Sequence, residues 1–186
     1  MLKRLIPYGH WGKSKAQALI LGAGGAGLAL AYSLLNSKEQ PTKIIITEIN
    51  SDRIYQTKQV LKRYIDDGLV EVVNVKEISA DTLLSRLPRG SLVANATGMG
   101  KDLPGSPISE KAEFPQDAIV WEFNYRGDLE FLKIAEVQKG RRNLFLEDGW
   151  DYFICGWTYV MSKVFHFKPT EELLAQFSSV AESFRE

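Results

Sequence analysis

The stretch from Gln17 to Asn36, QALILGAGGAGLALAYSLLN, constrains the fold of this chain more than any other. Its apolar run Ala18 to Leu21 predicts a buried strand, and the apolar residues from Leu28 to Leu35 recur at helical spacing. Glycines at the spacing G-x-G-x-x-G stand between the two, which is typical of a dinucleotide-binding turn. We therefore predict a strand, a tight turn and a helix that together bind nucleotide phosphates. The alternative is a plain glycine turn.

Each glycine of the turn has its own predicted task. Gly22 allows the chain to turn out of the strand, Gly24 lets a pyrophosphate approach the backbone, and Gly27 lets the helix pack closely on the sheet. The first residues of the helix, Gly25 and Ala26, carry amides that have no partner within the helix and lie at the positive end of its dipole. These amides would face the phosphates.

Composition limits the possible classes of protein. The chain has 186 residues, 45% of them hydrophobic, which suits a globular domain with a sizeable core. Lys plus Arg and Asp plus Glu both number 23, so no overall charge favours nucleic acid. No apolar run is long enough to span a membrane, and the single cysteine and two histidines argue against a metal site. The prediction is a cytoplasmic protein that binds no metal, membrane or nucleic acid.

Strand and helix patterns alternate along the chain after the glycine turn. This alternation predicts an α/β fold, a doubly wound Rossmann-like parallel sheet of about six strands with C-terminal helices. We expect a lead-in segment at 1–15, a dinucleotide-binding domain at 16–147 and a helical segment at 148–186 that packs on it. The expected strands are 18–21, 43–48, 70–75, 91–96, 118–123 and 143–146, and the expected helices between them are 28–35, 51–66, 81–87 and 128–138, the last closed by Gly140.

The C-terminal segment carries more apolar surface than one side of a sheet can cover. Gly149 to Phe167 is rich in aromatic residues, among them Trp150 and Trp157, and Thr170 is expected to cap a final amphipathic helix. That helix covers part of the surface at most. We predict that the remainder meets a second copy of the chain or a separate substrate domain.

Glu48 stands at the end of the second predicted strand. In dinucleotide folds a carboxylate at this place accepts hydrogen bonds from the adenine ribose and repels a 2′-phosphate. The sequence therefore favours NAD, with NADP less favoured, although Arg53 nearby leaves room for a phosphate. The alternative is a solvated surface glutamate at a strand end.

A polar, glycine-rich segment follows the fourth predicted strand, at the sheet edge where ligands of open α/β folds bind. We expect its side chains to fix the loop or to reach the cofactor. A turn closed by Asn and Thr side chains is an equally good interpretation. The candidate cofactor residues in this segment are Asn95, Ala96, Thr97, Gly98 and Met99.

The order of these motifs resembles the cofactor-binding half of the shikimate and quinate dehydrogenases. GAGGAG after the first strand, NATGMG after the fourth, then WEFNYRGDLEFL and finally EDGWDYFICGW follow the family's order and spacing over most of the chain. The resemblance implies an NAD(P)-binding Rossmann domain of a hydride-transferring enzyme. It also places Tyr125 and Gly149 on the substrate side of the cofactor.

The chain departs from the family pattern at several positions. An Asn-Arg-Thr segment of the NADP-dependent members is replaced by Thr47-Glu48-Ile49, which agrees with NAD. The family's proline and threonine after Tyr125 are replaced by Gly127 and Glu130, and its glutamine falls on Gly156. The family's catalytic lysine and aspartate belong to a substrate domain, which residues 1–15 are too short to form.

Three functional hypotheses stay open at this point. In the first hypothesis, the chain is the cofactor half of an oxidoreductase that acts on a hydroxylated cyclic acid when a substrate domain is supplied, and its catalytic residues are unknown. Alternatively it is a dinucleotide-binding module without catalysis, as the changed positions Gly127, Glu130 and Gly156 suggest. The third hypothesis is a different Rossmann oxidoreductase, similar to methylene-tetrahydrofolate dehydrogenase or glutamyl-tRNA reductase.

Overall fold

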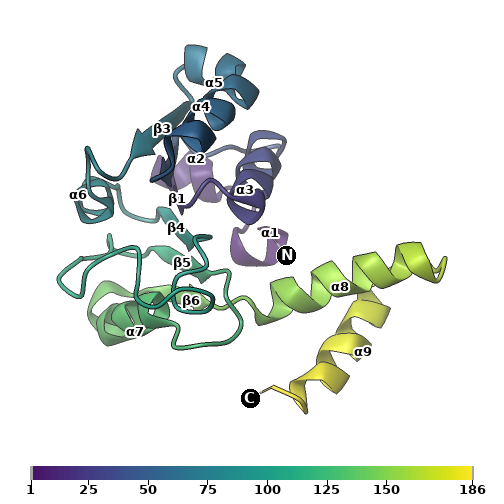
Figure 1. Ribbon diagram of the computed structural model, residues 1–186. Coiled ribbons are helices and arrows are strands. Elements are labelled where there is room, and N and C mark those ends of the chain that lie inside the picture. Colours follow the sequence, from purple (N-terminus) through teal and green to yellow (C-terminus); the bar gives the residue numbers. More distant parts are fainter. Residues whose placement is uncertain (1, 186) are drawn as a thin grey trace.

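A computed structural model describes residues 2–185 and contains one parallel sheet (Figure 1). Its order is β3-β2-β1-β4-β5-β6, so the chain moves outward from β1 in one direction and then returns to build the other half of the sheet. This confirms the predicted doubly wound fold. The strands are β1 (Ala18–Leu21), β2 (Ile44–Glu48), β3 (Val70–Asn74), β4 (Leu92–Asn95), β5 (Ile119–Glu122) and β6 (Phe145–Glu147).

Helices cover both faces of this sheet, and each face has its own apolar core. In β1, Ile20 points into the core beneath the N-terminal helices, whereas Leu19 and Leu21 point into the core beneath α6 and α7. The helices are α1 (Leu2–Leu5), α2 (His10–Ser14), α3 (Gly25–Leu35), α4 (Ser51–Val60), α5 (Lys62–Asp66), α6 (Ala80–Ser85), α7 (Glu130–Arg142), α8 (Trp150–Val164) and α9 (Glu171–Glu182).

The first residues pack on the sheet more closely than a loose lead-in. Leu5 of α1 and Trp11 of α2 are buried in the same core as Ile20. Arg4 of α1 also forms ion pairs with Glu147 at the end of β6 and with Asp151 of α8. The N-terminal segment therefore joins β1 and α3 on one side to the start of α8 on the other.

All four predicted helices have different bounds in the structure, and the helices expected at 51–66 and 128–138 show the most informative differences. The helix expected at 51–66 is broken at Leu61 into α4 and α5. The side chain of Asn50 caps α4 by accepting a hydrogen bond from the amide of Arg53 at 3.0 Å. Val60 of α4 is apolar but 74% exposed, because it lies away from the side on which Ile54 and Leu61 pack.

The helix expected to end before Gly140 continues to Arg142, so Gly140 does not close it. The residue that ends α7 is Asn143, in a left-handed conformation with φ 50°. Asparagine tolerates this conformation better than most residues, and its side chain also donates to Asp117 at 2.8 Å. The start was misplaced too, because Leu129, with φ 48°, precedes the first turn at Glu130.

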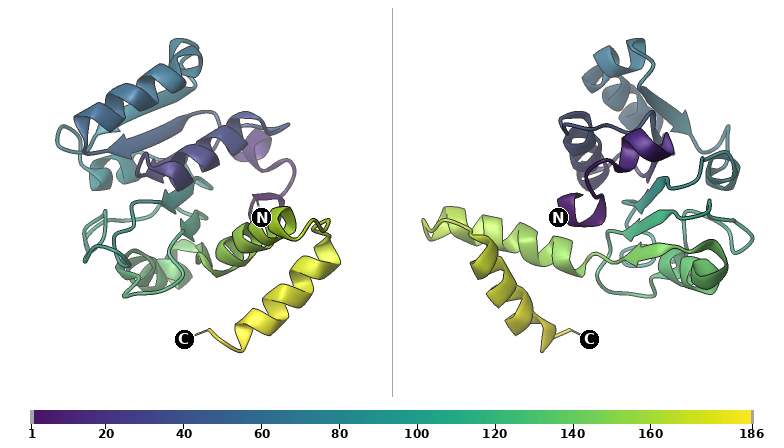
Figure 2. Two further views of the ribbon diagram at one scale, coloured as in Figure 1. Left: turned by 45° about the vertical axis from the view of Figure 1, so that its right-hand side comes forward. Right: turned by 180° about the vertical axis from the view of Figure 1, so that it is seen from behind.

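The C-terminal helices project from the sheet. Figures 1 and 2 show α8 leading away from β6 and α9 folding back along it. Thr170 caps α9 as predicted, and its side chain accepts from the amide of Leu173 at 3.2 Å. Only the first turns of α8 reach the main core, where Tyr152 packs against Trp121 and Phe123. Within residues 2–185, none of the helices combines the length and apolar character that crossing a membrane requires.

Candidate functional site

The glycine turn joins β1 to α3 at the centre of the sheet. Gly22 has φ 98°, and a Cβ there would lie 2.8 Å from the carbonyl oxygen of Ala96. A Cβ at Gly27 would lie 2.0 Å from the carbonyl oxygen of Gly22, so this glycine lets the helix approach the turn itself. Gly24 precedes α3 and would meet nothing within 4 Å. The turn thus has two sterically required glycines and one that faces open space.

A cavity of about 410 Å³ opens beside this open position. It lies at the carboxyl ends of β1, β2 and β4, where the chain reverses its direction of travel through the sheet. The predicted cofactor residues that line it are Gly22, Gly24, Glu48, Ala96, Thr97 and Met99. Arg53, Val75, Leu103 and Ser106 line it as well.

Glu48 is not the solvated surface residue of the alternative interpretation. It is 7% exposed, and its carboxylate accepts from the amides of Ile49 at 2.8 Å and Asn50 at 3.0 Å. Arg53 of α4 forms an ion pair with it at 3.3 Å. Burial acts to raise the pKa of Glu48, but these two amides and the guanidinium act in the opposite direction and hold the pKa below its usual value. Glu48 is therefore ionised at neutral pH.

Asn95 lies beneath the loop that lines the cavity. It is fully buried, and its Oδ1 accepts from the amide of Thr97 at 3.1 Å and from the hydroxyl of Thr97 at 2.7 Å. The Thr97 hydroxyl oxygen in turn accepts from the amide of Met99 at 3.1 Å. Asn95 thus shapes the loop and does not line the cavity, whereas Thr97 and Met99 do both.

Glu122 is the site residue that sequence reasoning missed. It ends β5 as the register partner of Asn95, is completely buried, and accepts from Asn95 Nδ2 at 2.7 Å and from the amide of Asn124 at 2.9 Å. Burial raises its pKa to about 7, although these amide donors favour the ionised form. The available signal was a carboxylate within the otherwise apolar strand AIVWEF.

A second cavity, of about 360 Å³, adjoins the first and shares Ala96 and Thr97 with it. The predicted residues Ala26, Gly98 and Tyr125 line it. Tyr125 stacks on Phe153 of α8 with ring centroids 4.1 Å apart. Lys101 also lines this cavity. Its ammonium lies 3.0 Å from the carboxylate of Asp102 and 5.7 Å from the centre of the Tyr125 ring. A donor beside an acceptor suits hydroxyl or carboxylate groups of a ligand.

Three further predicted residues line neither cavity: Gly27, whose contact with Gly22 is described above, Gly25 and Gly149. Gly25 begins α3, with nothing within 4 Å of an added Cβ. Gly149 is buried, and a Cβ there would lie 2.1 Å from the carbonyl oxygen of Phe123. Its position lets α8 begin directly against the end of β5, so its observed role is close packing.

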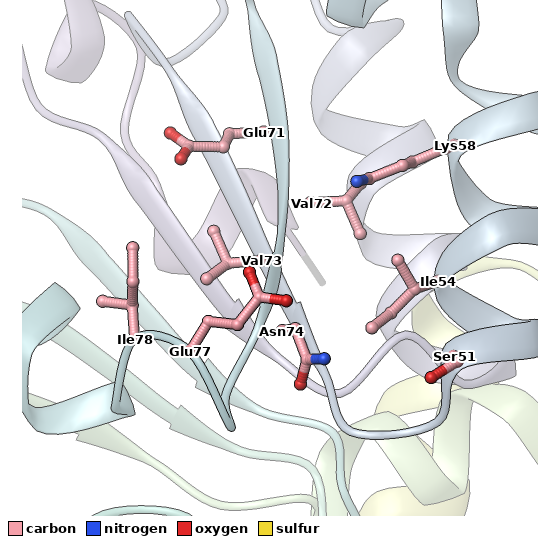
Figure 3. A pocket seen from close by; sticks show the side chains of 9 residues that line it. All are labelled: Ser51, Ile54, Lys58, Glu71, Val72, Val73, Asn74, Glu77 and Ile78. Atoms are coloured by element: carbon pink, nitrogen blue, oxygen red, sulfur yellow. The ribbon is translucent and has the colours of Figure 1, made fainter.

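Another hollow, of about 310 Å³, lies at the outer edge of β3 and holds none of the predicted cofactor residues. Figure 3 shows Val72, Ile54 and Lys58 to one side of the β3 ribbon and Glu71, Val73 and Ile78 to the other. It is separated from the glycine turn by β2. Among the described residues, no group of three or more His, Cys, Asp and Glu side chains is placed to hold a metal ion.

The strand order, the glycine turn and the cavity at the reversal point together define the Rossmann class of fold. Comparison with known proteins shows which members of this class the chain is similar to. The chain is 32% identical to the shikimate dehydrogenase (NADP+) of Salinibacter ruber over 113 residues, and the match covers 59% of this chain and 38% of that enzyme. It is 30% identical over 122 residues to the shikimate dehydrogenase (NADP+) of Streptococcus pneumoniae, covering 64% and 41%. No protein-family model matches.

Solved structures give the same picture of the fold. The quinate dehydrogenase of Corynebacterium glutamicum in complex with NAD matches with a TM-score of 0.71 at 19% identity, covering 98% of this chain and 58% of that one. The sequence resemblance to the shikimate and quinate dehydrogenases is therefore confirmed for the C-terminal part of those enzymes. The chain spans about two fifths of the length of the curated relatives it matches.

Proposed function

We propose that this chain binds NAD in the cavity beside the glycine turn. The observation that carries the proposal is the buried, ionised carboxylate of Glu48, which lies at the carboxyl end of β2 in the same cavity as Gly22 and Gly24. An ionised carboxylate accepts hydrogen bonds from both hydroxyls of the adenine ribose and repels a 2′-phosphate. The relatives named above are an NAD-bound quinate dehydrogenase and shikimate dehydrogenases named for NADP+, so the family contains both cofactors.

In this proposal each of the two adjoining cavities holds one half of the dinucleotide. The adenosine half lies against Glu48 and Val75, the pyrophosphate faces Gly24 and the first amides of α3, and the nicotinamide reaches the second cavity. The open space at Gly24 suits a phosphate approaching the backbone. Thr97 lines both cavities, so it would lie between the two halves of the bound dinucleotide.

We further propose hydride transfer on a hydroxylated cyclic acid, once a substrate-binding domain is supplied. NAD provides the hydride acceptor for such a reaction. This chain would hold the cofactor and offer the wall formed by Tyr125 and Lys101 to the substrate. A domain opposite that wall would have to orient the reacting carbon and manage the proton.

The test is calorimetric titration of the full chain with NAD+ and with NADP+. We expect NAD+ to bind in the micromolar to sub-millimolar range and NADP+ to bind more weakly. Glu48→Gln should weaken NAD+ binding about tenfold, because a hydrogen bond to a charged group contributes about 1.5 to 3 kcal/mol. Lys58→Ala is the control for removal of the Arg53 cation, because Lys58 also lies on α4 but outside this cavity.

Arg53→Ala distinguishes the two cofactors. If Arg53 serves only to orient Glu48, its loss should weaken NAD+ binding slightly and leave NADP+ weak. Tighter binding of NADP+ than NAD+, abolished by Arg53→Ala, would assign the guanidinium to a 2′-phosphate and overturn the NAD preference. Failure of the wild-type chain to bind either dinucleotide would overturn the proposed function.

A non-catalytic dinucleotide-binding module is the second candidate function. It is favoured by Gly156, which occupies the family's glutamine position and lies exposed on α8 with no side chain to offer a substrate. Gly127 has a packing reason instead, because a Cβ there would lie 2.3 Å from the carbonyl oxygen of Gly100. The module would bind NAD as above and show no hydride transfer with any partner domain.

The exposed apolar side of α8 suits a partner in either case. Trp157 is 54% exposed, and Val160 and Val164 on the same side of the helix are exposed as well. We propose that this surface meets a second copy of the chain, with a separate substrate domain as the alternative.

A further inference from the structure

A buried hydrogen-bond network lies directly beneath the loop that lines both cavities. It links Glu122 at the end of β5 to Asn95 at the end of β4, Asn95 to Thr97 in the loop, and Thr97 to Met99. Asn95 Nδ2 also donates to the carbonyl oxygen of Met99 at 3.4 Å. Asn124 closes it, because its amide donates to Glu122 and its side chain donates to the carbonyl oxygen of Met99 at 2.9 Å. None of these partners carries a formal charge besides Glu122 itself.

The direction of each hydrogen bond in this network is fixed. Thr97 presents a backbone N–H to Asn95, so the Asn95 atom that faces it must be the carbonyl oxygen Oδ1. The Asn95 amide group NH₂ must then face Glu122, and the backbone N–H of Asn124 faces the other carboxylate oxygen. Glu122 therefore meets a donor at both of its oxygens, which only the ionised carboxylate satisfies in full.

Protonation of Glu122 would break this arrangement. Its new O–H would point at a donor, and the backbone amide of Asn124 has no way to become an acceptor. The Asn95 side chain does, by rotating so that Oδ1 accepts from Glu122. That rotation turns NH₂ toward the amide of Thr97, which then loses its acceptor, and the loop loses the contact that shapes it.

We propose that Glu122 is a positioning residue for the dinucleotide. Through Asn95 it holds the Thr97–Met99 loop in its observed form only while both of its oxygens accept hydrogen bonds. This proposal rests on the proposed function, because the loop matters for affinity only if the dinucleotide binds against it.

The ionisation of Glu122 falls in the neutral range. Burial raises the pKa of Glu122, and the amides of Asn124 and Asn95 act to lower it, so that the pKa lies at about 7. Two ion pairs lie on the neighbouring elements: Lys101 pairs with Asp102 in the loop above, and Glu147 pairs with Arg4 between β6 and α1. Arg126, in the loop after β5, lies over the ring of Tyr125. Glu48, which lines the first cavity, has a lowered pKa and does not titrate in this range.

The affinity for NAD+ should therefore depend on pH. If only the ionised form positions the loop, the apparent dissociation constant rises as the competent fraction falls, by about tenfold from pH 8 to pH 6. NAD+ is the probe to use, because the 2′-phosphate of NADP+ has its own ionisation near pH 6. Amide hydrogen exchange of Thr97 and Met99 without cofactor should show a parallel loss of protection.

Glu122→Gln tests the network, because its NH₂ group mimics the protonated acid. We expect this variant to show weak NAD+ binding and low Thr97 protection at pH 8, with no further change at pH 6. Glu147→Gln is the matched control, because burial raises the pKa of Glu147 too, but its carboxylate forms an ion pair with Arg4, which is not a member of the network. This control should keep the wild-type pH dependence.

Several results would overturn the proposal. Glu122→Gln retaining wild-type affinity and pH dependence would do so, and so would wild-type protection of Thr97 that does not change between pH 6 and pH 8. If Glu122→Gln fails to fold, Glu122→Asp keeps an acceptor-only side chain and must keep the pH dependence. If the wild-type chain binds no NAD+ at any pH, the proposed function fails, while the exchange data still decide whether Glu122 holds the loop.

Discussion

Two glutamates at the carboxyl ends of strands in the same parallel sheet have pKa values that are shifted in opposite directions. Glu48 at the end of β2 has Arg53 beside it, and its pKa is held low. Glu122 at the end of β5 has only neutral amides, and its pKa rises to about 7. Glu48 accepts three backbone amide hydrogen bonds and Glu122 accepts two amide hydrogen bonds, so the difference follows from burial, the additional donor and the presence of a cation. Glu48 suits a permanent ribose acceptor, and Glu122 suits a group that changes state near neutral pH.

At the residue scale, one glycine of the turn is expected to matter for stability and another for cofactor binding. Gly27→Ala should destabilise the fold by about 3 kcal/mol or more, because its Cβ would overlap the carbonyl oxygen of Gly22. Gly24→Ala should change stability by less than about 1 kcal/mol, because its Cβ meets nothing, yet it should abolish NAD+ binding by filling the approach to the backbone.

Urea unfolding and calorimetry of these two variants check the prediction together. Gly156→Ala is a control for alanine in an open helical position, because Gly156 lies on α8 with no atom nearby. Unchanged NAD+ affinity in Gly24→Ala would mean that the pyrophosphate does not pass this residue.

At the scale of single elements, α7 shows why helix ends are hard to predict. Gly140 suggested a C-terminal cap, but the helix continues through it, and Asn143 adopts the left-handed conformation instead. The sequence offers both residues within one turn of each other. Asn143 ends the helix because its side chain also reaches Asp117 in the loop before β5, a contact that sequence spacing does not reveal.

Gly140→Ala tests the position of this helix end. Within a helix interior, alanine is favoured over glycine by about 0.5 to 1 kcal/mol, and nothing lies within 4 Å of the added Cβ. We expect the free energy of unfolding to rise by that amount in urea denaturation. A loss of stability would indicate that Gly140 needs a conformation only glycine adopts, contrary to the structure.

At the scale of the whole molecule, α8 and α9 extend beyond the sheet that the rest of the chain covers (Figure 2). Tyr125, Phe153 and Trp157 form a continuous aromatic row from the second cavity outward along α8. A partner bound to this row would lie next to the place proposed for the nicotinamide. A partner bound to this surface would therefore be close enough to the cofactor to take part in catalysis.

We expect the wild-type chain to self-associate through this surface at concentrations of tens of micromolar. Trp157→Lys should shift it to a monomer, because a charged side chain would have to be buried without a partner. Val137→Lys is the control, since Val137 is also apolar and is 85% exposed but lies on α7. Light scattering coupled to size-exclusion chromatography gives the mass of each variant, and a wild-type monomer at high concentration would contradict the prediction.

The sequence by itself determined the fold class, the glycine turn and the position of Glu48. These features are local: an apolar run, a glycine spacing and a residue at a strand end carry their meaning within a few positions of the chain. It also indicated the family resemblance, because the motifs keep their order.

The contacts of Glu122 with Asn95 and of Lys101 with Tyr125 depend on the tertiary structure. Asn95 and Glu122 lie 27 positions apart in the sequence and meet because β4 and β5 are neighbours in register. The ionisation of Glu122 follows from burial by several elements at once, which no single stretch of sequence encodes. The same holds for α8, whose exposed apolar side depends on where the last strand ends and on what the sheet has left uncovered.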